Sequence, residues 1–406
     1  MSDKTIATLA QRGVKLLSPQ SISIAEDVDL GRIHGPDTVL YPGTRLAGDK
    51  TLIMPGAKIG QETPATVINC AIGPKVSLKG GFFEEAVFLE RASMGSAAHV
   101  RAGTLLEEQA NAAHAVGLKH TILLPFVTLG SLINFCDALM AGGTSRRDHS
   151  EVGSSFIHFN FTPFGQSGDK ATPSLIGDVP HGVMLRSRRI FLGGQAGLVG
   201  PTRIDYGTVL AAGFVYRRQH GPDQLVVGER VAHTTRAFTA ASYTRIADKV
   251  ALNLEYIGNL AALWHWYERV RLSEASGALQ QLYTQARETI ELAIEERIKR
   301  LGALAAYMDE SVANLRASQS PRPEEIARQE RFAREWPTAA DRLASYRNFC
   351  DGDDPQCQAL LAAYRQAAGD NYTDRIAALD DNGVAAATSW LQRIVAQATA
   401  CLSLDS

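Results

Sequence analysis

The feature of the sequence that most constrains the fold is an apolar residue that recurs every six positions through the first half of the chain. A period of six matches neither the alternation of an ordinary strand nor the 3.6-residue turn of an α-helix. It predicts a triangular solenoid, in which each hexapeptide forms one side and places one apolar residue in the interior. The runs that carry the period are Ile22, Val28, Leu40, Leu46 and Leu52, interrupted by His34; Met94, Val100, Leu106, Ala112, Leu118 and Leu124; and Leu192, Leu198, Ile204, Leu210 and Tyr216.

Glycine often follows the apolar position, as in Leu30-Gly31, Ile72-Gly73 and Met94-Gly95. A tight corner tolerates little side-chain bulk, so these glycines fit the ends of the sides. One coil of such a stack cannot bury its own apolar face, and we therefore expect stability to accumulate over neighbouring coils, with both ends capped.

The composition changes near residue 240, from Gly, Val, Ile and Thr to long stretches of Ala, Leu, Glu, Gln and Arg. We predict a β-helix domain over 14–240 and an α-helical domain over 241–406. Helical spacing predicts helices over 246–272 and 278–315, and further helices near 324–348, 356–368 and 372–402. Within the second helix, residues spaced alternately four and three form a heptad seam for a helix of the same chain or of another copy: Ile294, Ile298, Leu301, Ala305, Met308, Val312 and Leu315.

Charge and segment patterns exclude several classes of protein. The 406 residues include 41 basic and 43 acidic side chains, so there is no general field to attract nucleic acid or an anionic membrane. No signal-peptide h-region and no uninterrupted apolar run of about 18 residues occurs, and we expect a cytoplasmic protein. Five scattered cysteines without CxxC spacing, and the absence of HExxH, predict neither disulfides nor a metal site.

Several non-repeat motifs occur in a fixed order along the solenoid: AHVRAGTLLEE (98–108), VGLKHT (116–121), EVGSSFIHFNF (151–161) and IFLGGQAGLVGP (190–201). On these motifs the segment from about 14 to 218 resembles the acetyltransferase arm of the bacterial bifunctional enzyme that acetylates glucosamine-1-phosphate and then uridylylates it. The resemblance implies a left-handed parallel β-helix, a homotrimer, and acetyl-CoA or another acyl-CoA held between coils of neighbouring subunits. It covers about half of the chain.

The resemblance also assigns binding residues. Arg101 and Lys119 match the cationic residues that hold the acceptor, and an Arg fork and a Lys point charge both suit phosphate oxygens. The cofactor side is matched by small residues and an amide, with a phenylalanine in place of the family's tyrosine: Ser154, Asn160, Phe161 and Ala212.

The chain departs from the family at the general base. The run GSLINFCDAL (130–139) puts Phe135 where the family has its catalytic histidine and Ala138 where it has an acceptor-binding tyrosine. Glu151 stands where the family has an acceptor-binding asparagine. Loss of the histidine leaves open which group would take the proton of an attacking amine.

Nearby groups could replace that histidine. His149 and Glu151 are two residues apart and would share one face of an extended segment, as would His158 with its neighbour two positions on. Asp137 is a further candidate. The isolated His99, His114 and His120 are interpreted as coil-face residues rather than catalytic groups.

Two basic clusters, 145–147 and 186–189, could bind the phosphates of CoA or of a nucleotide acceptor, or could lie solvated on the surface. The leading prediction is an acyltransferase that moves an acyl group from acyl-CoA to the amine of an amino sugar, phosphorylated or nucleotide-linked. The alternative is a non-catalytic trimeric protein that binds a sugar phosphate or nucleotide sugar, or a scaffold with the helical half as its interaction module. Loss of the family histidine favours the alternative.

Overall fold

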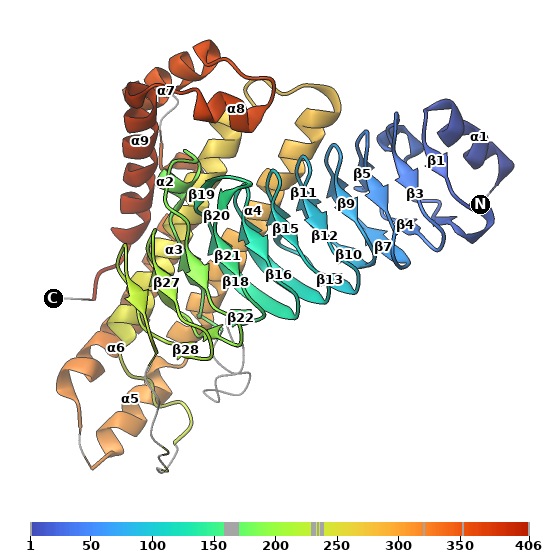
Figure 1. Ribbon diagram of the computed structural model, residues 1–406. Coiled ribbons are helices and arrows are strands. Elements are labelled where there is room, and N and C mark those ends of the chain that lie inside the picture. The colour runs from blue at the N-terminus through green and yellow to red at the C-terminus, as the bar shows by residue number, and fades with distance from the viewer. Residues whose placement is uncertain are drawn as a thin grey trace.

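The computed structural model describes residues 2–157, 170–228, 233, 235, 239–319, 321–350 and 353–404. Short parallel strands stack into a left-handed β-helix with three faces, and a helical region follows it (Figure 1). The fold predicted from the hexapeptide period is confirmed. Its first face consists of β1 (Lys15–Leu16), β3 (Val39–Leu40), β6 (Lys58–Ile59), β9 (Ser77–Leu78), β12 (Ser93–Met94), β15 (Asn111–Ala112), β17 (Thr128–Leu129), β21 (Glu151–Val152), β24 (Phe191–Leu192), β27 (Val209–Leu210) and β29 (Leu225–Val226).

The second and third faces are joined, because β16 and β18 each run around the corner between them and pair on both sides of it. The second face contains β2 (Ser23–Ile24), β4 (Arg45–Ala47), β7 (Ala65–Ile68), β10 (Gly81–Glu84), β13 (Ala98–Val100), the first parts of β16 (Val116–Leu123) and β18 (Ile133–Met140), β22 (Phe156–Ile157), β25 (Gly197–Leu198) and β28 (Val215–Tyr216). The third face contains β5 (Leu52–Ile53), β8 (Ala71–Ile72), β11 (Ala86–Phe88), β14 (Thr104–Leu106), the last parts of β16 and β18, β23 (Ser174–Ile176) and β26 (Thr202–Ile204).

Two apolar cores follow from this arrangement. One fills the interior of the solenoid and is closed at the N-terminal end by α1 (Asp3–Gln11), whose Leu9 is fully buried against the first coil. The other lies between the outer side of the third face and the helices, where α4 contacts β8, β11 and β14. Figure 1 shows the helices gathered on one side of the C-terminal coils, while the N-terminal coils project away from them.

The helical region begins with α3 (Ile246–Trp266), which continues into a π-helical turn (Tyr267–Arg271). It goes on with α4 (Gly277–Ala305), α5 (Met308–Ala317), α6 (Pro323–Ala344), α7 (Pro355–Gln366), α8 (Tyr372–Ala377) and α9 (Asp381–Thr399). One short helix, α2 (Val179–Gly182), and a hairpin of β19 (Gly143–Ser145) and β20 (Asp148–His149) are insertions in the solenoid. No helix in the described part of the chain is long and apolar enough to cross a membrane.

Two details differ from the sequence-based expectation. Leu52 and Leu124 face the helices, and their neighbours Ile53 and Leu123 occupy the solenoid interior. The period therefore slips by one residue at these two places on the third face, which is apolar on both sides, as in sheets covered by helices. The predicted helix over 278–315 is interrupted after Ala305 and resumes as α5.

The heptad seam packs within the chain. Its members are buried or nearly so, and α4 and α5 contact α3 and α6 of the same chain. The seam is therefore not a free surface for another copy. The division into domains 14–240 and 241–406 stays a prediction, and the second core draws residues from both sides of it.

Candidate functional site

Two cations lie in adjacent coils at the corner between the second and third faces. Arg101 follows β13, and its backbone N–H donates to Leu118 O at 2.9 Å, which holds it beside the next coil. Lys119 lies in β16, directly next to Cys136 of β18. Arg101 is exposed and Lys119 is half-buried. Among the described residues, neither side chain forms an ion pair, so a doubly positive surface remains available to an anion.

The thiol of Cys136 lies in the field of both cations. Burial raises its pKa and Asp137 raises it further, while Arg101 and Lys119 act in the opposite direction. The raised pKa keeps the thiol protonated near neutral pH, so it is a poor nucleophile. The corner is therefore suited to binding an anion and not to covalent catalysis by this cysteine.

Asp137 is engaged by the helical region. Its Oδ1 accepts from Arg297 Nη2 at 2.7 Å, and both side chains are almost entirely buried. Arg297 also donates to Lys170 O at 3.1 Å. The ion pair joins β18 to α4, and the carboxylate faces its arginine rather than the solvent side of the corner.

His149 and Glu151 lie side by side, as their spacing predicts. The hairpin folds back over the first face because Arg146 donates to the carbonyls of Gln109 and Phe126, at 3.1 and 2.6 Å. His149 Nδ1 is 3.0 Å from Arg146 O, and Nε2 is 3.9 Å from Glu151 Oε2. Burial, followed by the positive charge of Arg146, lowers the pKa of His149, which favours a neutral imidazole.

The structure does not bring the two groups of candidates together within one chain. Arg101 and Lys119 occupy the second face and its corner, whereas His149 and Glu151 lie on the first face and at its edge. A site that uses both groups would need a second copy of the chain.

Ser154 and Ala212 lie two coils apart on the corner between the first and second faces. The coils are in close contact there: a Cβ on Gly153 would come within 2.7 Å of Gly194 Cα, and one on Gly193 within 2.4 Å of Ala212 N. The stacking itself therefore requires glycine at positions 153 and 193, beside Ser154 and Ala212. Asn160, Phe161 and His158 lie outside the described residues.

The positions matched to the family's histidine and tyrosine point inward. Phe135 pairs in register with Leu118 and Ile157, and both Phe135 and Ala138 are fully buried in the solenoid core. An imidazole or phenol there would be buried among apolar side chains. The outward neighbours in this strand are Asn134 and Cys136.

The basic clusters are largely occupied by protein groups. Arg186 pairs with Asp381 at 2.9 Å, Arg188 with Asp223, and Arg189 with Asp148 at 3.6 Å. These contacts hold the insertions against the solenoid and α9. Arg147 is exposed, without an ion pair in the part of the chain that the structure describes.

A buried charge cluster that the sequence did not predict lies under the helices. Arg271 donates to both oxygens of Glu108, at 2.5 and 2.9 Å, and Tyr267 donates to Glu107 Oε1 at 2.6 Å. The guanidinium of Arg271 lies over the Tyr372 ring, 3.1 Å from its centroid. Burial raises the pKa of Glu107 to about 7. The sequence signal was two adjacent carboxylates directly after an apolar strand, at the end of AHVRAGTLLEE.

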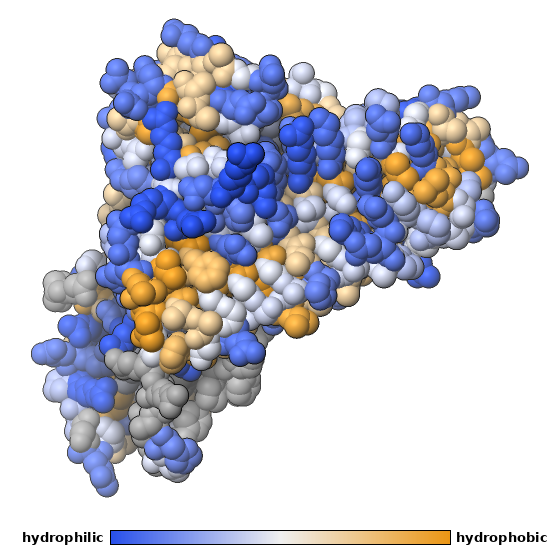
Figure 2. All heavy atoms as spheres, viewed as in Figure 1, coloured by the Kyte–Doolittle hydropathy of each residue, from blue (hydrophilic) through white to orange (hydrophobic). Residues whose placement is uncertain are grey.

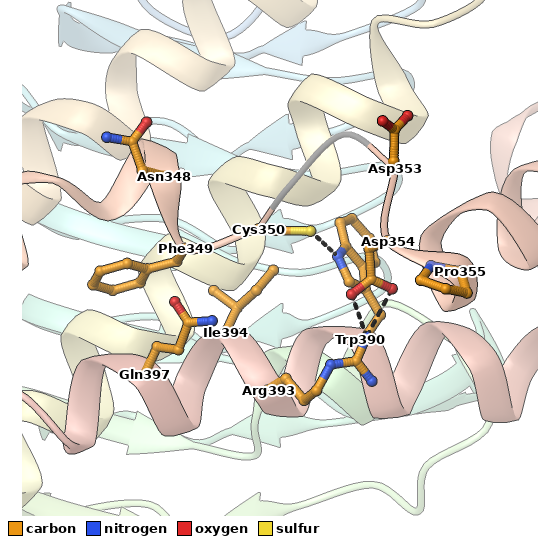
Figure 3. A pocket seen from close by; sticks show the side chains of 10 residues that line it. All are labelled: Asn348, Phe349, Cys350, Asp353, Asp354, Pro355, Trp390, Arg393, Ile394 and Gln397. Atoms are coloured by element: carbon orange, nitrogen blue, oxygen red, sulfur yellow. Dashed lines mark hydrogen bonds and ion pairs between the residues drawn. The ribbon is translucent and has the colours of Figure 1, made fainter.

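A cavity in the helical region, about 330 Å³, offers little chemistry (Figure 3). Arg393 is paired with Asp354, whose oxygens lie 2.5 and 2.7 Å from Nη2. Trp390 Nε1 donates to Cys350 Sγ at 2.8 Å, and burial raises the pKa of this thiol. The cavity therefore has neither a free cation nor an activated nucleophile among its described lining residues. Nowhere in the described ranges do three His, Cys, Asp or Glu side chains gather as metal ligands would.

No family model matches the chain. Among curated proteins, it is 26% identical over 231 residues to the bifunctional protein GlmU of Thermotoga maritima, covering 55% of this chain and 44% of that protein. The solenoid resembles GlmU. The protein of the same name from Nocardia farcinica is 27% identical over 248 residues, covering 58% and 44%. The chain thus spans less than half the length of these curated relatives.

Two solved structures align at 11% identity. The polysialic acid O-acetyltransferase OatWY covers 55% of this chain and 93% of its own, with a TM-score of 0.16. LpxA from Acinetobacter baumannii covers 71% and 97%, with a TM-score of 0.15.

Proposed function

We propose that the chain is an acyltransferase that moves an acyl group from acyl-CoA, acetyl-CoA being the first donor to test, to the amine of a phosphorylated or nucleotide-linked amino sugar. The observation that carries the proposal is the pair Arg101 and Lys119, stacked in adjacent coils without a carboxylate partner among the described residues. Strands of neighbouring coils are about 4.8 Å apart, so two cations at this spacing can bind one phosphate group together.

The similarity of the solenoid to GlmU supports this assignment. Both cations lie in the motifs AHVRAGT and VGLKHT, on which the sequence resembles the acetyltransferase arm. In the reaction the amine nitrogen attacks the thioester carbonyl, the C–S bond breaks, and the amine proton ends on the released thiol. The donor would lie along the corner that carries Ser154 and Ala212. Asn160 and Phe161 are proposed to line it too.

A homotrimer is part of the proposal. The helices cover the third face, so we propose that a partner copy packs against the first and second faces. Apolar side chains are exposed on the last coils of these two faces, where Figure 2 shows an apolar patch: Phe191, Val209, Val215 and Leu225. In such an assembly His149 and Glu151 of one copy could approach the anion corner of another. We propose a cytoplasmic location, in keeping with acyl-CoA as the donor.

The non-catalytic alternative has its own support, because Phe135 and Ala138 are buried where the family's matched residues do chemistry. Thiol release from acetyl-CoA separates the two functions. We expect release with glucosamine 1-phosphate, slower release with glucosamine, and none with N-acetylglucosamine 1-phosphate, whose amine is blocked. Binding of glucosamine 1-phosphate without any thiol release would establish the binding protein and overturn the enzyme.

A further inference from the structure

His120 lies at the same corner as the two cations. It follows Lys119 directly, and its backbone N–H donates to Ala102 O at 3.1 Å in the coil of Arg101. The residue has a φ of 46°, the left-handed conformation that turns β16 from the second face to the third. Its side chain is therefore presented at the corner, next to the proposed phosphate site, rather than along a flat face.

The imidazole of His120 rests on Gly103. A Cβ at Gly103 would lie 2.2 Å from His120 Nδ1, so this glycine provides the space for the ring. Nδ1 is buried and has no hydrogen-bond partner among the described residues. A buried polar atom without a partner costs about 1–3 kcal/mol, and such atoms are rare enough to call for an explanation.

The charged groups around His120 do not hold it in the protonated form. On the solenoid it faces Lys119 and Asp137, and on α4 it faces Arg297 and Glu296. Both carboxylates are already paired, Asp137 with Arg297 at 2.7 Å and Glu296 with Arg300 at 2.6 Å. Burial is the main cause of the lowered pKa of His120. The ring is therefore neutral near pH 7 and able to accept a proton.

We propose that His120 is the general base of the acyl transfer, a role that rests on the proposed function. The phosphate of the acceptor binds Arg101 and Lys119, and its amine is directed to His120. As the amine nitrogen bonds to the thioester carbon, His120 takes the proton from that nitrogen. It returns the proton to the CoA sulfur when the C–S bond breaks, so the products are the amide and the free thiol. His149 then has no part in the chemistry.

The test compares His120→Asn with His114→Asn, an exposed histidine on another corner of the solenoid. Asparagine tolerates the left-handed conformation, so the first variant removes the imidazole and keeps the corner. We expect His120→Asn to lower kcat for glucosamine 1-phosphate and acetyl-CoA by about 10²–10⁴-fold and to leave acceptor binding intact. Wild-type kcat/KM should fall at acid pH as His120 becomes protonated, with a pKa below 6.5. This acid-side decline should be absent in His120→Asn.

A wild type without turnover would overturn the proposed function, and the role of His120 with it. An active wild type with His120→Asn within about threefold of His114→Asn would overturn the role of His120 alone. NMR gives a readout independent of turnover and of the variant's folding. The wild-type imidazole resonance assigned to His120 should shift when glucosamine 1-phosphate is added, and an unshifted resonance at saturation would also overturn the proposal.

Discussion

Two pairs of cations, one from the helices and one from the solenoid, lie in different surroundings. Arg271 and Arg297 come from the helices, are buried, and each contacts a carboxylate on the solenoid. Arg101 and Lys119 belong to the solenoid, reach solvent, and have no ion-pair partner among the described residues. A buried charge is tolerated only with a partner, whereas a surface cation needs none. The first pair thus attaches the helices, and the second is available to a ligand.

The largest expected effect is on stability. Arg271→Met would leave Glu107 and Glu108 buried without their cation, and we expect the free energy of unfolding to fall by about 3–5 kcal/mol. Arg101→Ala should change it by less than about 0.5 kcal/mol. Denaturant unfolding of both variants checks the difference. If Arg271→Met and Arg101→Ala lost equal unfolding free energy, the buried and the exposed cations would not differ in their contribution to stability.

The next effect is a pH dependence of the buried cluster. Burial raises the pKa of Glu107 from 4.5 to about 7, so the folded chain binds a proton that the unfolded chain has released between these values. Its contribution to stability is full below pH 4.5 and is lost as the pH rises through 7.

Glu107→Gln mimics the protonated acid and should flatten the decline in unfolding free energy between pH 5 and 8 by about 2 kcal/mol. Unfolding at four pH values in this range, for the wild type and the variant, gives the measurement. If the unfolding free energies of the wild type and the variant changed with pH in parallel, the titrating group would not be Glu107.

A smaller effect concerns binding. Arg101→Ala and Lys119→Ala should each weaken binding of glucosamine 1-phosphate by about 1–3 kcal/mol, the range for a hydrogen bond to a charged group. Thermal stability should be nearly unchanged. Arg45→Ala, an exposed cation of the same face several coils away, is the matched control in calorimetric titration. Equal affinity in all three variants would refute the anion site.

The smallest expected effect is that salt weakens ligand binding at the exposed pair, Arg101 and Lys119, and leaves the buried ion pairs of Arg271 unchanged. The Debye length is about 10 Å at 0.1 M and 3 Å at 1 M, and it acts mainly on exposed charges. Raising NaCl from 0.1 to 0.5 M should weaken binding of glucosamine 1-phosphate by roughly 0.5–1 kcal/mol. The stability difference between the wild type and Arg271→Met should stay constant over this range. If the binding free energy and the stability difference both declined with salt, Arg271 would not differ from Arg101 and Lys119 in its exposure to solvent.

The solenoid could be predicted from the sequence because its period is local: each coil buries residues contributed by one hexapeptide after another. The slip at Leu52 and Leu124 also had a signal, since Leu105 and Leu106 in β14 and ALM in β18 are apolar at successive positions, as in a sheet covered on both sides. The break after Ala305 had only a weak signal, because Gly302 lies three residues before it, inside α4, and no proline follows.

The site was harder to predict for physical reasons. Asp137 is a plausible base in isolation, and its role changes only because Arg297, 160 residues later, reaches it. Glu108 and Arg271 are 163 residues apart. His120 was interpreted as a coil-face residue because its left-handed corner and its contact with Gly103 are properties of the stacked coils. The surroundings of these side chains depend on contacts between distant segments, which residue types alone do not predict.

The contacts of α4 with β8, β11 and β14 constrain how the solenoid can change in length. Repeat proteins commonly gain or lose units by duplication or deletion, because each unit touches only its neighbours. An extra coil inserted between β11 and β14 would move Glu108 by about 4.8 Å away from β11 and β8. The rigid helix α4 could then not keep its contacts with the coils on both sides of the insertion. A coil added before β2 would meet no such restriction. Natural length variation is therefore expected at the N-terminal end, and the coils under α4 should keep a fixed number.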